Sequence, residues 1–166
     1  MIPPQYQSGE NHYVWGYPYL LSVEEGYRSA SVALTQDQMI LRVRRKTSLK
    51  KRKAAIDAWY AGEVQKDAPP LIAKWEPLIG VRSGPFSVRR MKTRWGSCNT
   101  LTKAIRLNSE LAKKPRVCLE YVVIHELVHL LERRHNARFR KFMDQFMPGW
   151  KAHKKLLNRF PHDEKE

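Results

Sequence analysis

Hydrophobic positions in the first third of the chain follow a β-strand pattern. Aromatic and β-branched residues concentrate at 13–23, with a break predicted near Gly16 and Pro18, and again at 30–34 and 39–43. Short polar stretches separate these segments and predict turns between them. The N-terminal region is therefore expected to form a small β-sheet.

The pattern changes to helical spacing after residue 48. Ser48 is a suitable N-cap, and apolar residues three and four positions apart predict a helix to about Lys66. The Pro69-Pro70 pair is expected to end this helix, because proline lacks an amide hydrogen and its ring clashes with the preceding turn. A second helix is predicted for residues 71–79.

The second half of the chain alternates between strand and helix patterns. Residues 86–95 and 104–108 predict two strands that pair across a turn. A strongly apolar helix is predicted after Pro115, and Asn136 is expected to cap the next helix. A last helix is predicted from about Trp150.

Strands and helices in this order predict an α+β fold in which a small antiparallel or mixed sheet packs on helices. The length of 166 residues suits a single domain with a sizeable core. We expect one domain over residues 1–166, with a β and helical part at about 1–80 and a second part at about 84–160.

The segment 121–132 is apolar almost all the way round the predicted helix, which is typical of a buried helix. Buried helices rarely carry ionisable residues unless these are paired or bind a metal, yet His125, Glu126 and His129 lie in this segment. Residues four apart share one helical face, with Cβ atoms about 5–6 Å apart. Two imidazoles at that separation can both reach one ion at about 2.0–2.1 Å.

A catalytic zinc site has three protein ligands and one open position. His135, six residues after His129, is the best third ligand and completes the pattern HExxHx5H. We therefore expect one Zn²⁺ per chain, held by His125, His129 and His135. Glu126 points about 100° away around the helix and is expected to be the catalytic general base. The alternative is two buried core histidines and one on the surface.

Five segments of the region 94–157 form a specific combination: Arg94–Cys98, Ile105–Asn108, Tyr121–His129, His135-Asn136 with Phe139, and Met147-Pro148. Through them the region resembles the YgjP-like (DUF45) metallopeptidase family, which is related to the SprT-like and WLM zincins. The resemblance implies a zincin-like fold in which a peptide substrate adds as a strand to a sheet edge near Arg94–Cys98. The histidine spacing also fits a metzincin, but that group carries glycine at the position of Glu132.

Three further residues have roles that the sequence leaves open. Tyr121 lies one turn before His125 and is one candidate for stabilising an oxyanion, and Arg94 is another by resemblance. Glu132 either orients a ligand histidine or is a solvated carboxylate at the helix end.

Charge and composition widen the choice of partners. The net charge is +15 and the pI is about 10.1, which favours polyanions such as nucleic acid; the alternative is a basic surface that keeps the protein in solution. No apolar run is long enough for a membrane span, and no signal peptide is recognised. Two isolated cysteines, Cys98 and Cys118, suit the reducing cytoplasm. Nothing in the sequence indicates an oligomeric state.

These features together predict a zinc-dependent metallohydrolase, with a metallopeptidase acting on peptides or proteins as the first choice. A zinc-dependent hydrolase of nucleotide phosphoanhydrides is an alternative, because the motif does not specify the bond and the positive charge favours nucleotides. A DNA-associated protease or binding module is a second alternative. No membrane partner is expected.

Overall fold

The computed structural model describes residues 2–159. Two small sheets and four α-helices make up this part of the chain, together with one short 3-10 helix, η1. In chain order the elements are β1 (Asn11–Val14), β2 (Tyr17–Glu25), β3 (Ser31–Leu34), β4 (Gln38–Val43), α1 (Leu49–Ile79), β5 (Phe86–Arg89), β6 (Gly96–Cys98), β7 (Ile105–Asn108), η1 (Ser109–Lys113), α2 (Arg116–Val128), α3 (Ala137–Phe146) and α4 (Trp150–Arg159). The predicted α+β class is confirmed.

The N-terminal sheet has the strand order β1-β2-β4-β3. Strand β2 pairs antiparallel with β1 and parallel with β4, and β3 pairs antiparallel with β4. The predicted break in the first strand lies at Trp15 and Gly16, which both have positive φ, whereas Pro18 lies within β2. Leu21, Met39 and Leu41 are buried on the inner face, where the sheet packs on the first half of α1, and they belong to the same hydrophobic core as the helices.

Helix α1 is continuous, so the predicted stop at Pro69-Pro70 is wrong. Both prolines and Pro77 lie on the exposed side of the helix, where the carbonyl groups that lose a hydrogen-bond partner face solvent. The buried face continues past them at regular spacing: Ile56, Tyr60, Val64, Ala68, Ile72 and Ile79. Burial of this stripe offsets the roughly 3 kcal/mol that a proline costs inside a helix. Ser48 caps α1 as predicted, accepting a hydrogen bond from the Lys51 amide.

The second sheet has the order β5-β7-β6, with β7 parallel to β5 and antiparallel to β6. The prediction of one strand over 86–95 is wrong, because β5 ends at Arg89 and β6 begins at Gly96. The buried side chain of Asn108 holds the intervening loop: its Nδ2 donates to the carbonyls of Met91 and Arg94, and its Oδ1 accepts from the Met91 amide. The tight turn between β6 and β7 is as expected.

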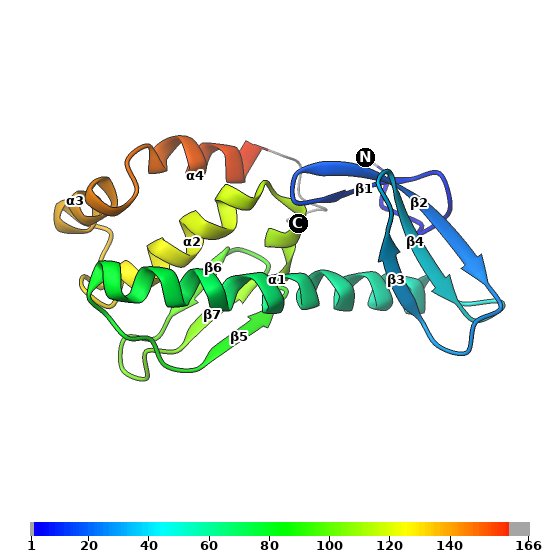
Figure 1. Ribbon diagram of the computed structural model, residues 1–166, viewed down its shortest axis with the longest axis horizontal. Helices are drawn as coiled ribbons and strands as arrows, with labels where there is room; N and C mark the ends of the chain where they lie inside the picture. Colours follow the sequence, from blue (N-terminus) through cyan, green and yellow to red (C-terminus); the bar gives the residue numbers. More distant parts are fainter. Residues whose placement is uncertain (1, 160–166) are drawn as a thin grey trace.

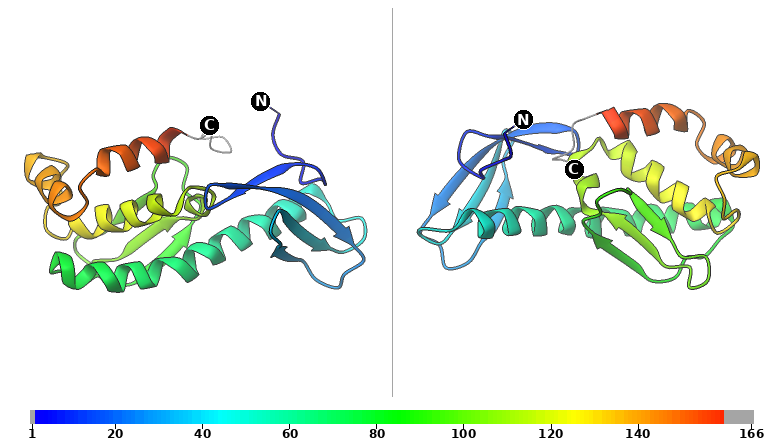
Figure 2. Two further views of the ribbon diagram at one scale, coloured as in Figure 1. Left: turned by 45° about the horizontal axis from the view of Figure 1, so that its top comes forward. Right: turned by 180° about the vertical axis from the view of Figure 1, so that it is seen from behind.

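Helix α2 lies at the centre of the second half of the molecule. It runs between α4 on one side and the β5–β7 sheet with α1 on the other (Figures 1 and 2). Nine of its thirteen residues are buried, including Val123, Ile124 and Leu127. Such enclosure fixes the helix on all sides, which suits a helix that carries reactive side chains.

Backbone hydrogen bonds join the two halves of the molecule near the start of α2. The amides of Trp15 and Gly16 donate to the carbonyls of Ala112 and Lys113 at 2.7 and 3.2 Å. Gly16 has φ +85°, and a Cβ there would lie 3.0–3.2 Å from atoms of Pro115, so a side chain would disturb this contact. Among the described helices, none is both long and apolar enough to cross a membrane.

Candidate metal centre

Two of the three predicted ligands come from α2 and its C-terminus. His125 lies in the last turn of the helix, and His129 is the first residue beyond it, with φ and ψ still helical. The chain then turns back, and His135 lies just before Asn136, which caps α3 by accepting a hydrogen bond from the Phe139 amide. The predicted cap is confirmed, and the turn places His135 over the end of α2.

The Nε2 atoms of the three histidines form a small triangle. They are 3.3 Å apart between His125 and His129, 3.2 Å between His125 and His135, and 2.9 Å between His129 and His135. Nitrogen atoms that bind one tetrahedral ion at about 2.0–2.1 Å lie about 3.3–3.4 Å apart, so the triangle has the size that a metal requires. Within residues 2–159, no other group of three His, Cys, Asp or Glu side chains meets at one point in this way.

The outer nitrogens of two of these rings have acceptors that select the tautomer. His129 Nδ1 lies 3.1 Å from the carbonyl oxygen of Glu132, which only accepts, so Nδ1 carries the proton and Nε2 presents a lone pair. His125 Nδ1 lies 3.4 Å from the hydroxyl of Tyr121, which accepts in the tautomer that leaves Nε2 free. The inner nitrogens can therefore act as ligands.

Phe139 packs against all three imidazoles. Its ring centroid lies 4.9, 4.7 and 5.0 Å from those of His125, His129 and His135, and it stacks on His129 at 28°. The sequence suggested that Phe139 belongs to the apolar face of α3 and to the residues that carry the family resemblance. The structure shows that it also restricts the ring orientation of each candidate ligand.

The turn that carries His135 is held by the carboxylate of Glu132. This carboxylate accepts hydrogen bonds from Asn136 Nδ2 and the Arg134 amide, and forms an ion pair with Arg138 at 3.0 Å. Arg140 also donates to the His135 carbonyl. The Glu132 carboxylate therefore orders the turn on which His135 lies, while the Glu132 backbone carbonyl contacts His129 directly.

Burial keeps the imidazoles of His125 and His129 neutral. It lowers the pKa of His125 to about 3, with further lowering from His129, His135 and Lys154. Burial also lowers the pKa of His129, although the hydrogen bond to the Glu132 carbonyl opposes this. Neutral imidazoles at neutral pH have lone pairs available, as ligand chemistry requires.

Glu126 lies beside the histidine triangle and is only 5% exposed. Burial raises the pKa of its carboxyl group to about 8, while Arg94 opposes this shift. A divalent cation held by the neighbouring histidines would lower this pKa again and favour the carboxylate. The group is therefore placed to exchange a proton near neutral pH.

Strand β6 approaches Glu126 closely because residue 96 is glycine. A Cβ at Gly96 would lie 2.9 Å from Val122 Cγ1 and 3.0 Å from Glu126 Oε2. Gly96→Ala should therefore displace the carboxylate and reduce kcat/KM roughly tenfold to a hundredfold with the metal content unchanged. Steady-state kinetics together with metal analysis measure both quantities.

Gly62 provides the matched control, since it lies in α1 and a Cβ there meets no atom within 4 Å. Gly62→Ala should leave kcat/KM unchanged and stabilise the protein by about 0.5–1 kcal/mol, because alanine loses less backbone entropy in a helix. If Gly96→Ala were as active as Gly62→Ala, the close packing of β6 on Glu126 would have no role in the site.

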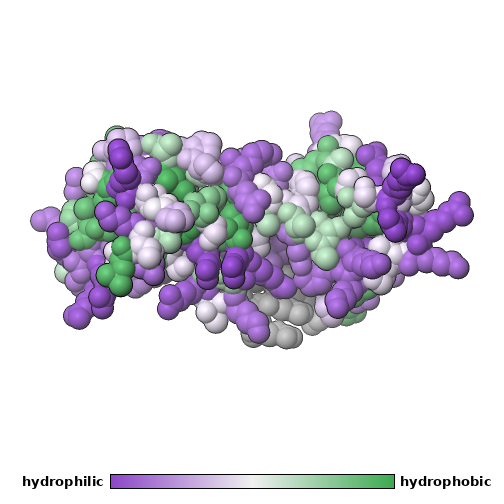
Figure 3. Space-filling view, turned by 90° about the horizontal axis from the view of Figure 1, so that it is seen from below, coloured by the Kyte–Doolittle hydropathy of each residue, from purple (hydrophilic) through white to green (hydrophobic). Residues whose placement is uncertain are grey.

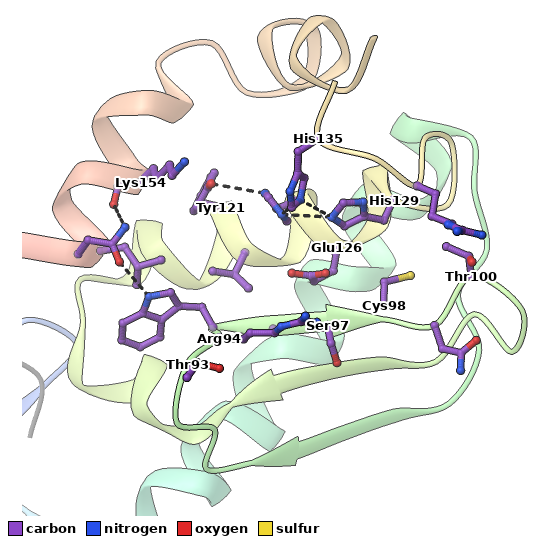
Figure 4. A pocket seen from close by; sticks show the side chains of 18 of the residues that line it. Thr93, Arg94, Ser97, Cys98, Thr100, Tyr121, Glu126, His129, His135 and Lys154 are labelled. Carbon is purple, nitrogen blue, oxygen red and sulfur yellow. Dashed lines mark hydrogen bonds between the residues drawn. The ribbon is translucent and has the colours of Figure 1, made fainter. Parts of the chain in front are cut away.

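The site opens into a pocket of about 810 Å³. One wall is the segment from Thr93 to Leu101, including β6; the opposite wall is α4, which contributes Lys154, Leu157 and Asn158. Figure 4 shows the side chains of Glu126, His129 and His135 facing this space, with Lys154 and Arg94 on different sides of it. A substrate can therefore reach the histidines and Glu126 together.

Two other groups that line the pocket remain protonated at neutral pH. Burial, and to a smaller extent Glu126, raises the pKa of Tyr121 to about 12 and that of Cys98 to about 11. Tyr121 is also stacked on Trp150, with ring centroids 6.5 Å apart and planes within 3°. Its hydroxyl is thus a fixed hydrogen-bond donor or acceptor. Cys98 and the buried Cys118 are both free thiols, as expected.

A family model for the YgjP-like metallopeptidase domain matches residues 1–160. The chain belongs to this family. The resemblance seen in residues 94–157 is therefore confirmed, and the match also includes the N-terminal sheet and α1 of this YgjP-like domain. Membership makes it a metallohydrolase of the metallopeptidase class and implies a metal cofactor, for which the three histidines provide a suitable set of donors.

Two solved structures of metallopeptidase zymogens are similar to the YgjP-like domain over 55% of its chain. Jannalysin of Methanocaldococcus jannaschii is 20% identical, with 91% of its chain covered and a TM-score of 0.47. Abylysin of Pyrococcus abyssi is 21% identical, with 90% covered and a TM-score of 0.49. Among proteins with curated descriptions, none has significant similarity to this chain.

Proposed function

We propose that the protein is a zinc-dependent metallopeptidase in which His125, His129 and His135 hold the metal and Glu126 is the general base. The observation that carries this proposal is the triangle of three Nε2 atoms, 2.9–3.3 Å apart, beside a buried carboxylate in an open pocket. Three histidine ligands leave a fourth position free, which is typical of catalytic rather than structural zinc.

When bound, zinc supplies Lewis-acid chemistry that polarises a carbonyl group and makes a water molecule more acidic. Glu126 accepts the proton of the attacking water and returns it to the leaving amine. Tyr121 and Arg94 both line the pocket and both can donate to an oxyanion; the hydroxyl of Tyr121 keeps its proton because burial raises its pKa to about 12.

The position of β6 supports a peptide substrate. It is an edge strand in the order β5-β7-β6, and its residues Gly96, Ser97 and Cys98 line the pocket that contains Glu126. An extended peptide can pair with such an edge through main-chain hydrogen bonds, which places a backbone carbonyl beside the metal position.

The test is hydrolysis of casein and of a panel of nucleoside triphosphates by the zinc-loaded protein, with and without a chelator. We expect chelator-sensitive cleavage of casein. Triphosphate hydrolysis without any peptide cleavage would contradict the peptidase function and support a phosphoanhydride hydrolase. The cations Arg94, Arg133 and Lys154 around the pocket favour this alternative.

We further propose a nucleic-acid contact at the end of the molecule that carries the N-terminal sheet. Side chains from the β2–β3 turn, the end of β4 and the start of α1 form an exposed basic cluster: Arg28, Arg44, Arg45, Lys46, Lys50 and Lys51. Figure 3 shows long hydrophilic side chains that extend from this end. The nearby acids Glu24 and Glu25 already pair with Arg42 and Arg52.

Replacing Lys46, Lys50 and Lys51 by glutamine should weaken binding to double-stranded DNA and reduce its salt dependence. With fewer phosphate contacts, binding releases fewer counterions from the DNA. Peptidase activity on casein should not change, since this cluster lies outside the pocket. Binding that was equally strong and equally salt-dependent in the triple variant would show that this surface is not the contact.

A further inference from the structure

The pocket carries an excess of positive charge that the described residues do not neutralise with ion pairs. Arg94, Arg133 and Lys154 line it, whereas Glu126 is the carboxylate in its lining. In the part of the chain that the structure describes, no ion pair joins any of these three cations to a carboxylate. Cations just outside the pocket differ in this respect, since Arg138 pairs with Glu132.

Lys154 is the cation on the wall opposite β6. It lies on α4, and the helix is fixed there by Asn158, whose Oδ1 accepts from Trp95 Nε1 at 3.2 Å and whose Nδ2 donates to the Lys154 carbonyl at 3.0 Å. Leu157, buried between them, anchors the same helix face. The base of the Lys154 side chain is therefore held in place, while its ammonium group stays exposed at the pocket.

Lys154 lines the same pocket as His125 and Glu126, so its charge acts on any group that is bound beside the metal position. A bound divalent cation would add further positive charge. A substrate that occupies the pocket would thus meet three cations and, among the described lining residues, the single carboxylate of Glu126.

We propose that Lys154 and the adjacent α4 wall form a subsite for a substrate carboxylate, so that the enzyme prefers peptides with an acidic group near the scissile bond. This inference rests on the proposed peptidase function and adds its substrate class. The carboxylate belongs either to an Asp or Glu side chain or to the C-terminus of a short peptide, and both have the same recognition chemistry.

The test compares kcat/KM for matched peptides with blocked ends that carry Glu, Gln or Lys at each position around the cleaved bond. The Gln peptides are also measured with a free C-terminus. The wild type should prefer a carboxylate over its neutral counterpart by roughly three- to tenfold, as expected for one partly exposed charge pair. The blocked and free peptides distinguish a side-chain carboxylate from a terminal one.

Three variants test whether Lys154 causes the preference for a carboxylate. Lys154→Gln should remove the preference, and Lys154→Glu should reverse it in favour of the Lys peptides. Lys155→Gln is the matched control, because Lys155 is an exposed neighbour on α4 that does not line the pocket, and it should behave as the wild type. A wild type without preference, or a preference that persists in Lys154→Gln, would overturn the proposal.

A binding measurement distinguishes failure of the Lys154 subsite from failure of the proposed peptidase function. Calorimetry with the zinc-loaded Glu126→Gln variant and the same peptides measures selection without turnover, and the Glu peptide should bind more tightly than the Gln peptide only when Lys154 is present. If peptides are cleaved without this difference, the function stands and the subsite is wrong. If a triphosphate, but no acidic peptide, binds in a manner that depends on Lys154, the assignment to a carboxylate is wrong.

Discussion

Glu126→Gln should reduce kcat/KM on casein-derived peptides by roughly 10²–10⁴-fold, the usual contribution of a general base. The amide has the same shape as the carboxyl group but cannot accept the proton of the attacking water. Zinc content should remain one per chain, because the triangle of Nε2 atoms involves only the histidines. Kinetics and metal analysis of the same preparation test both statements.

The fold of this variant should be intact. Burial raises the pKa of Glu126 to about 8 in the metal-free protein. A carboxyl group with a raised pKa favours folding below its unfolded pKa and loses that contribution as the pH rises towards 8. A neutral amide avoids the cost of burying a charge, so metal-free Glu126→Gln should be at least as stable as the wild type at pH 7. Loss of zinc from this variant would instead identify Glu126 as a ligand.

His135→Ala should abolish tight zinc binding. It removes one of three converging nitrogens, and the remaining two histidines of α2 cannot complete a catalytic zinc site. The side chain is exposed, so its loss should leave the metal-free fold unchanged. Thermal unfolding measures the loss of zinc binding. A metal that binds only the folded state stabilises that state by about 2.7 kcal/mol when free zinc is 100 times Kd.

The wild type should therefore show a zinc-dependent rise in Tm that His135→Ala lacks. His153→Ala is the matched control, because His153 lies on α4 outside the histidine triangle, and it should respond to zinc as the wild type does. An equal zinc response in His135→Ala and the wild type would mean that the third ligand lies elsewhere.

The part of the site that depends on local geometry was predictable from the sequence. His125 and His129 are four residues apart on a helix, and this spacing alone brings their rings to one face. The buried character of α2 followed from its continuous apolar run, and the caps Ser48 and Asn136 followed from residue type. Each of these inferences uses residues within one or two helical turns.

Features that depend on tertiary packing were not predictable in the same way. The parallel pairings of β2 with β4 and of β5 with β7 join segments that nothing in a single sequence assigns to each other. Helix α1 passes through Pro69 and Pro70 because its buried stripe continues beyond them, which outweighs the local cost.

Asn108 and Phe139 belong to the segments that carry the family resemblance, but only the structure shows the contacts through which they support the site. Asn108 fixes the loop that leads to Gly96, and Phe139 packs on all three histidines. A weak signal existed for Asn108, because a polar residue ends a short strand of alternating apolar residues. The hydrophobic pattern gave no signal for the contact of Phe139 with the histidines, since an apolar residue in the first turn of an amphipathic helix normally indicates core packing alone.

A zinc titration of chelator-treated protein, with peptidase activity measured at each addition, decides whether the three histidines form the catalytic metal site. We expect no activity without metal, a linear rise as zinc is added, and saturation at one zinc per chain. Activity that persists after complete removal of the metal, or protein that binds no zinc at micromolar concentrations, would contradict the assignment of His125, His129 and His135 as the catalytic metal site.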